Sequence, residues 1–144
     1  MKSLLNDVKP IPVAGAAAAA QTDVDGAVID MTQDSGYAAV CGVAQLGDVT
    51  ATCVLELTLR GSTAADGSNS VQLSTTGTFT AAASDADSKL LVLDHVQPMY
   101  RYVFHRLKRG TANAVVAGIV AYLHNPGATP GASSGVVKQA VGIG

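Results

Sequence analysis

The sequence predicts an all-β protein, an antiparallel β-sandwich of jelly-roll-like order with extended arms at its two ends. Short segments rich in aliphatic, Thr and aromatic residues alternate with clusters of Gly, Ser, Asn and Asp, and turn signals about every 8 to 12 residues are typical of sandwiches. No segment of useful length has the period of an amphipathic helix. The chain of 144 residues is 48% hydrophobic but only 14% charged, whereas soluble domains average roughly 25% charged residues. We therefore expect other protein to cover part of its surface.

Composition divides the chain into three parts. These are an extended N-terminal arm, a β-sandwich body and a flexible C-terminal tail, expected at residues 1–22, 23–125 and 126–144. Two prolines keep the arm extended, and Pro, Gly and Ser fill the first half of the tail. The apolar residues of the two ends that we expect to contact a partner are Pro10, Ile11, Val136 and Val137.

The strands of the body are expected at residues 27–31, 37–44, 53–60, 71–74, 77–80, 89–94, 100–107 and 114–123. In residues 53–60 the odd-numbered positions are all apolar, which predicts that they face the core. Tyr100, Tyr102 and Phe104 share one face of the next-to-last strand, and we expect that face in the core. The last strand is apolar on both faces, which predicts a central strand with a covered outer face. A small up-and-down barrel would use the same strands and is the alternative architecture.

Sequence patterns that could carry chemistry are incomplete. The G-x-S-x-G pattern at residues 131–135 lacks the preceding strand and following helix of a nucleophile elbow, and no Asp, Glu or His follows Ser133. The three histidines are not spaced as metal ligands, and residues 23–26 lack the further oxygen ligands of a calcium loop. We therefore expect no enzymatic activity, no cofactor and no metal.

The two cysteines, Cys41 and Cys53, are placed symmetrically about Gly47. A hairpin that turned at Gly47 would bring them onto neighbouring strands, near enough for a disulfide. In a cytosolic assembly we favour reduced thiols that act as small core residues.

A basic cluster lies in and after the predicted strand at residues 100–107. Its members are Arg101, Arg106, Lys108 and Arg109. Interleaved aromatic residues make it resemble a surface for single-stranded nucleic acid. Because the aromatic side chains alternate onto the face opposite Arg101, we favour instead a basic loop that docks on an acidic neighbouring protein.

Membrane association is not expected. The longest apolar run, residues 114–123, is far shorter than the roughly 20 residues that a membrane-spanning helix needs. Charged residues and prolines interrupt the N-terminal segment before it could form the apolar region of a signal peptide.

In pattern and in its Ala-, Gly- and Thr-rich composition, the region from residue 24 to residue 126 resembles a family of small β proteins of tailed bacteriophages that decorate or cement the capsid. The stretches that carry the resemblance are residues 34–37, 54–67, 100–104 and 121–126. The resemblance implies a sandwich or jelly-roll body that binds the outside of an HK97-type shell as a homodimer or homotrimer and stabilises the lattice of the major capsid protein. It brings no catalytic residues, and it places the chain on the capsid exterior, with host cytoplasm as its location during assembly.

The expected mechanism is mechanical. The body would self-associate through an apolar strand face, while the arms and the basic loop at residues 106–109 bridge adjacent capsid subunits. The candidate residues of the apolar face are Val115, Ala117, Ile119 and Ala121. The alternatives are a low-copy tail or head-completion protein and, with less support, a β module for single-stranded nucleic acid.

Overall fold

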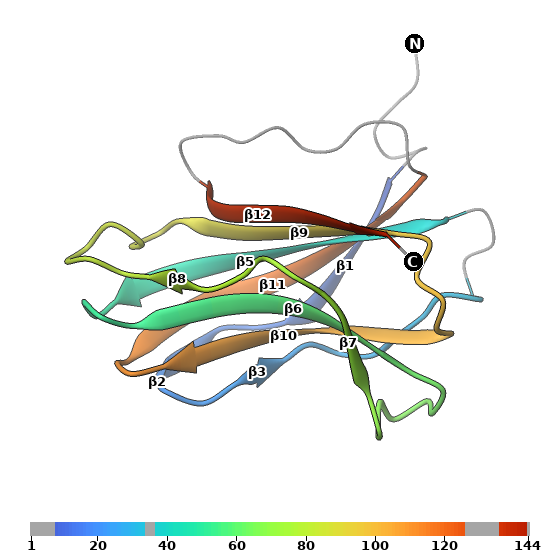
Figure 1. Cartoon of the computed structure of the whole chain (residues 1–144), viewed down its shortest axis with the longest axis horizontal. Helices are drawn as coiled ribbons and strands as arrows, with labels where there is room; N and C mark the ends of the chain where they lie inside the picture. Colours follow the sequence, from blue (N-terminus) through green and yellow to red (C-terminus); the bar gives the residue numbers. More distant parts are fainter. Residues whose placement is uncertain (1–7, 34–36, 126–135, 144) are drawn as a thin grey trace, which may run out of the picture.

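The computed structural model describes residues 8–33, 37–125 and 136–143, which form two β-sheets packed face to face (Figure 1). Sheet A consists of β1 (Val8–Ala14), β2 (Ala17–Ala20), β5 (Ala39–Val49), β9 (Leu90–Val96), β11 (Ala114–His124) and β12 (Val136–Ile143). Sheet B consists of β3 (Val24–Asp25), β4 (Ile29–Asp30), β6 (Val54–Ser62), β7 (Val71–Thr75), β8 (Phe79–Thr80) and β10 (Tyr102–Gly110). The predicted all-β sandwich is confirmed.

The chain passes repeatedly from one sheet to the other. Sheet A has the order β1-β11-β5-β9-β12, with β2 also beside β11, and sheet B has the order β3-β10-β6-β7, with β4 beside β10 and β8 beside β6. The successive strands β5 and β6 lie in different sheets, as do β10 and β11. An up-and-down barrel would pair successive strands, so that alternative is wrong. Pairing is antiparallel except between β12 and β9, which run parallel.

The core lies between the sheets and follows the alternation predicted for β6. Leu55, Leu57 and Leu59 are completely buried there, as the apolar period of this strand requires. Sheet A contributes fully buried side chains to the same core from its three central strands, among them Val40, Leu91, Leu93, Ile119 and Leu123.

The face assignment of β10 differs from the prediction. Val103, His105 and Leu107 are the fully buried side chains of this strand, whereas Tyr102 and Phe104 lie on the outer face of sheet B. Both faces of β10 contain large apolar side chains. The alternation of residues therefore shows which side chains share a face, but it does not show which face is turned toward the core. Phe104 is nevertheless well covered, because the loop after β6 packs on its ring at Gly67, whose φ is +76°.

A β-bulge changes the face of β11 halfway along the strand. The register with β5 shifts between Val116 and Gly118, and one extra residue in a strand moves every later side chain to the other face. As a result Ile119 and Ala121 are buried in the core, while Ala117 is exposed on the outer face. The predicted apolar face of Val115, Ala117, Ile119 and Ala121 is therefore wrong, since these four residues do not lie on one side.

Both ends of the described chain are part of sheet A. Residues 8–20, placed in the extended arm by sequence, form β1 and β2 on the flank of β11, and Val13 reaches the core. Residues 136–143, placed in the tail by sequence, form β12 on the opposite flank. These segments are extended, as predicted, but they are sheet strands.

The two cysteines are buried free thiols in different places. Cys53 belongs to the core, and Cys41 lies on β5 in the other sheet. The hairpin that would have made them neighbours is wrong because β5 and β6 do not pair, and no disulfide joins the two cysteines in the structure.

Candidate interaction surfaces

Two basic residues on the outer face of sheet B, Arg106 and Lys108, lie beside acids. Arg106 donates from Nε and Nη2 to the two carboxylate oxygens of Asp25 over 2.6 and 2.9 Å. Lys108 lies 3.8 Å from a carboxylate oxygen of Glu56 on the adjacent strand. The hydrogen bond from Arg106 to Asp25 raises the pKa of the guanidinium. The charges of Arg106 and Lys108 are thus paired with acids of the same chain.

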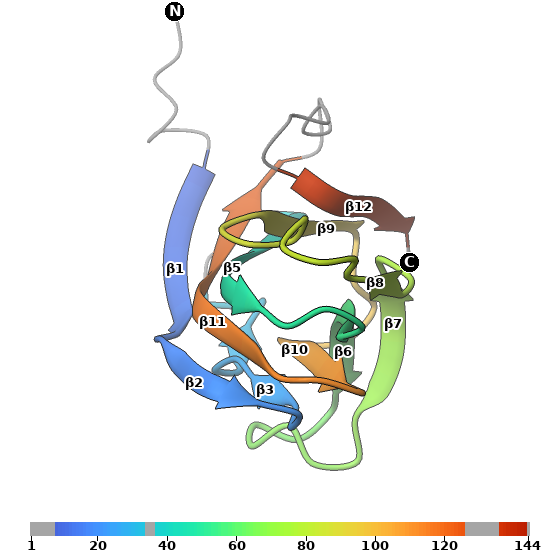
Figure 2. The same cartoon turned by 90° about the vertical axis from the view of Figure 1, so that its left-hand side faces the viewer.

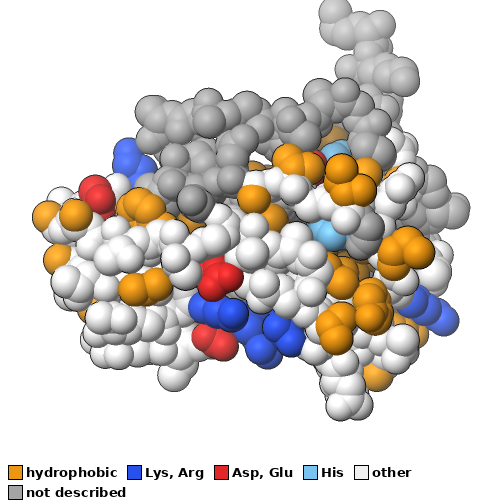
Figure 3. Space-filling model, in the orientation of Figure 1, with side chains coloured by type: hydrophobic (Ala, Val, Ile, Leu, Met, Phe, Trp, Pro, Cys, Tyr) orange, Lys and Arg blue, Asp and Glu red, His pale blue; other side chains and the backbone are white. Residues whose placement is uncertain are grey.

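Arg101, beside the start of β10, forms the same kind of pair. It donates from Nε and Nη2 to the two carboxylate oxygens of Asp30 over 3.1 and 3.0 Å. The guanidinium holds the pKa of the Asp30 carboxyl well below its usual range. In Figure 3 blue and red side chains lie next to one another in the lower middle of the molecule.

Arg109 is a structural residue that lies inside the chain. It is only 5% exposed and donates to the carbonyl oxygens of Thr22, Ala18 and Ala114 over 2.8, 2.8 and 2.6 Å. These bonds tie β10 of sheet B to β2 and β11 of sheet A. The prediction that Arg109 belongs to an accessible basic loop is wrong, because the sequence shows the charge but not the three carbonyl groups that surround it.

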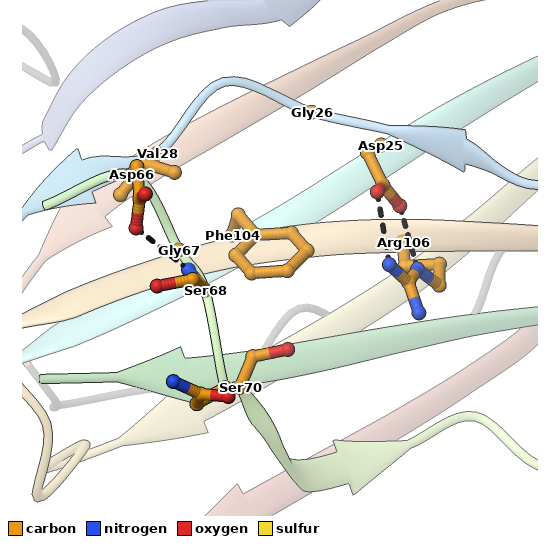
Figure 4. A pocket seen from close by; sticks show the side chains of 10 residues that line it. Asp25, Gly26, Val28, Asp66, Gly67, Ser68, Ser70, Phe104 and Arg106 are labelled. Carbon is orange, nitrogen blue, oxygen red and sulfur yellow. Dashed lines mark hydrogen bonds and ion pairs between the residues drawn. The ribbon is translucent and has the colours of Figure 1, made fainter. Parts of the chain in front are cut away.

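A shallow pocket of about 330 Å³ lies on the outer face of sheet B, beside Phe104 (Figure 4). The Asp25–Arg106 pair borders it on one side and the loop of residues 66–70 on the other. Asp66 accepts a hydrogen bond of 2.9 Å from the backbone N–H of Ser68, which lowers the pKa of this carboxyl. The charged side chains around the pocket are thus already engaged within the chain.

The outer face of sheet A carries a groove of about 470 Å³ whose lining contains no charged residue. It is lined by Ala14, Val43, Gln45, Leu90, Ala117, Gly118, Val120 and Tyr122. The side chains come from four different strands or their flanks, β1, β5, β9 and β11, so the groove crosses the middle of the sheet. Of the predicted apolar face, only Ala117 belongs to it.

One buried polar cluster lies further along this outer face. His124 Nε2 is 2.7 Å from Asp94 Oδ1, and the other oxygen of this buried carboxylate has no hydrogen-bond partner among the described residues. Cys41 lies opposite Asp94 in the β5–β9 register. Burial, together with the negative charge of Asp94, raises the pKa of Cys41 to about 12, so the thiol stays protonated at neutral pH. This cluster could not be predicted from sequence, because the contact between Asp94 and His124 spans 30 residues.

Two further histidines, His95 and His105, lie close together in the core. His105 is completely buried, with neither ring nitrogen hydrogen-bonded in the described part of the chain, and its ring packs so closely on Gly42 that a Cβ there would lie 2.3 Å away. His95 approaches Ser74 Oγ at 3.0 Å through Nδ1. Burial, and secondarily the nearby His95, lowers the pKa of His105 to about 4.

The candidate residues of the two chain ends lie on opposite edges of sheet A. Pro10 and Ile11 belong to β1, where Pro10 lies opposite Tyr122 of β11 and Ile11 packs partly against the core. Val136 and Val137 belong to β12, where Val136 lies opposite Leu90.

Within residues 8–33, 37–125 and 136–143, no group of three or more His, Cys, Asp or Glu side chains could hold a metal ion. The same residues contain no helix that is long and apolar enough to cross a membrane. No protein-family model matches the chain, and no curated protein matches it.

Proposed function

We propose that this chain is a structural virion protein that binds the outer surface of a tailed-phage capsid and stabilises the lattice of the major capsid protein. The observation that carries the proposal is the uncharged groove on the outer face of sheet A. Apolar surface that crosses several strands is suited to cover by another protein, and the low charge of the whole chain agrees with such a role.

The mechanism depends on interface area and on copy number. A single copy that covers a standard interface can bind weakly, because many copies on one particle act together. In this proposal the outer face of sheet A is turned toward the capsid protein, and the ion-paired outer face of sheet B is turned toward solvent.

The paired charges of β10 argue against the nucleic-acid alternative. A surface for single-stranded nucleic acid needs free cations beside exposed aromatic rings. Arg106 and Lys108 are instead beside Asp25 and Glu56, and Phe104 is buried. The second candidate is a low-copy tail or head-completion protein, which would use the same groove against a different partner.

The copy number of the chain in purified particles tests the proposal. Quantitative mass spectrometry against the major capsid protein is expected to give a ratio near one or a simple fraction of it. A handful of copies would favour the tail or head-completion protein, and absence from particles would overturn a virion role.

A matched pair of variants tests which face binds. Val120→Asp places a charge in the groove, and Val54→Asp places the same charge on the outer face of sheet B, where Val54 is likewise half-buried. Val120→Asp is expected to abolish binding to capsids while Val54→Asp retains it, and the opposite result would contradict the assignment of sheet A to the capsid.

A further inference from the structure

The strand β12 is an open edge of sheet A. It is the last strand in the sheet order, bonded to β9 on one side and to no strand on the other side within the described part of the chain. Figure 2 shows β12 at the margin of the molecule, beyond β9. A strand edge of this kind presents unpaired backbone N–H and C=O groups.

On the opposite edge of sheet A, the strand β1 is protected against pairing, whereas the short strand β2 on the same flank of β11 consists of four alanines. Pro10 and Pro12 of β1 have no backbone N–H to donate, and the register with β11 shifts after Pro12. Prolines and bulges are the devices by which natural proteins block edge pairing. The sequence of β12 contains no proline and no acidic residue, and its one charged residue is Lys138.

Large apolar side chains lie at the exposed end of β12. Val141 is 46% exposed and Ile143 is 79% exposed. Gly142 between them faces His95 and Ser74, because a Cβ at Gly142 would meet both of these side chains. Successive residues of a strand point to opposite faces, so Val141 and Ile143 project together from the outer face of sheet A. Orange side chains gather near this end of β12 in Figure 3.

We propose that β12 is the edge through which two copies of this chain pair, antiparallel across a two-fold axis, so that their A sheets join into one continuous sheet. An open strand edge accepts only another extended segment, and a two-fold interface uses the same patch on both copies. Val141 and Ile143 then contact the same apolar surface on the second copy. This inference does not depend on the capsid-binding role.

The charge of the strand selects the register. When Val141 lies opposite its own copy, Ile143 lies opposite Gln139, and the two Lys138 residues are far from one another. A pairing centred on Lys138 would oppose like charges, which is unfavourable on a sheet. Other registers near the C-terminal half of β12 also separate the lysines, and the exposed apolar side chains of Val141 and Ile143 place the proposed two-fold axis near Val141.

Cysteine crosslinking of the full chain tests the register. Val141→Cys, oxidised with copper phenanthroline, is expected to give a covalent dimer on a non-reducing gel. Val71→Cys is the matched control, since Val71 is 44% exposed on β7, and it is expected to stay monomeric on the gel, as is the wild type with its two buried thiols. A failure of Val141→Cys to crosslink, or equal crosslinking of Val71→Cys, would overturn the proposed axis.

The mass of the protein in solution tests the pairing itself. Light scattering after size-exclusion chromatography is expected to show a dimer for the wild type and a monomer for Ile143→Lys, with unchanged circular dichroism because Ile143 is largely exposed. A wild-type monomer or trimer, or a persistent Ile143→Lys dimer, contradicts the proposal. Because these measurements need no capsid, their failure is distinguishable from absence of the chain in virions.

Discussion

The two outer faces of the sandwich differ in their charged residues. On sheet B, arginines beside and within β10 are paired with aspartates of β3 and β4. On sheet A, the groove that crosses β5 and β11 contains no charged residue, and the polar pair Asp94–His124 is buried at its side. The same two-sheet core thus carries one outer face with ion pairs inside the chain and another outer face with an uncharged groove.

The largest expected effect separates the inner from the outer face of sheet A. Ile119→Ala should lower the free energy of unfolding by about 2 to 5 kcal/mol because it leaves a cavity in the core. Val120 is the next residue of the strand but lies on the outer face, in the groove. Val120→Ala should therefore lower the free energy of unfolding by less than about 1 kcal/mol. Urea unfolding of both variants measures the difference, and equal losses would contradict the position of the bulge in β11.

The next effect concerns the residue that joins the two sheets. Arg109→Met should cost about 2 to 3 kcal/mol of stability, because it removes the donor from three carbonyl groups in a buried site. Lys108→Met is the matched control on the outer face of sheet B and should change stability by less than about 0.5 kcal/mol. If thermal denaturation shows similar values for both, Arg109 is not the link between the sheets.

A smaller effect depends on pH. Because the pKa of His105 is about 4 in the folded chain and about 6.5 in an unfolded one, the unfolded state binds a proton first as the pH falls. The free energy of unfolding therefore keeps this contribution above about pH 6.5 and loses it as the pH falls toward 4. The loss between pH 7 and pH 5 is about 2 kcal/mol.

Urea titrations at several pH values measure this loss. His105→Gln should flatten the dependence between pH 7 and pH 5, whatever its effect on stability at pH 7. An unchanged slope in this variant would show that another group, rather than the core imidazole, takes up the proton.

The smallest effect is expected on the ion-paired face. A double-mutant cycle with Arg106→Ala and Asp25→Ala should give a coupling of at most about 1 kcal/mol, since both side chains are partly exposed. The coupling should shrink further in high salt. A coupling of several kcal/mol would mean that the outer face of sheet B contributes as much to stability as the core does.

The fold class and the inner face of β6 could be predicted because the apolar period of residues 53–60 is interrupted by polar residues on the other face. The inner face of β10 could not, because Phe104 and Val103 are both apolar and a buried neutral histidine looks polar in sequence. In β11, a period of two was extended across a bulge that only the pairing with β5 reveals.

The candidate surfaces were less accessible to sequence reasoning. Arg106 and Arg109 stand three residues apart, yet one is paired with an aspartate on the surface and the other is enclosed by backbone carbonyl groups. The difference between their surroundings comes from residues 18–25, which supply Asp25 to Arg106 and carbonyl groups to Arg109. These residues are more than eighty positions away in the chain. The prolines of the N-terminal segment predict an extended conformation, and an edge strand tolerates them as well as a free arm does.

The two prolines of β1 also determine how far any assembly of sheets can grow. A sheet with two open edges can add molecules at either end without limit, which is the geometry of a fibril. Pro10 and Pro12 lie on one edge of sheet A, and β12 is the edge of the described sheet that we propose to pair with a second copy. Once two β12 strands are paired, the joined sheet presents β1 toward its outer edges, and the prolines of β1 disfavour the addition of a further strand there.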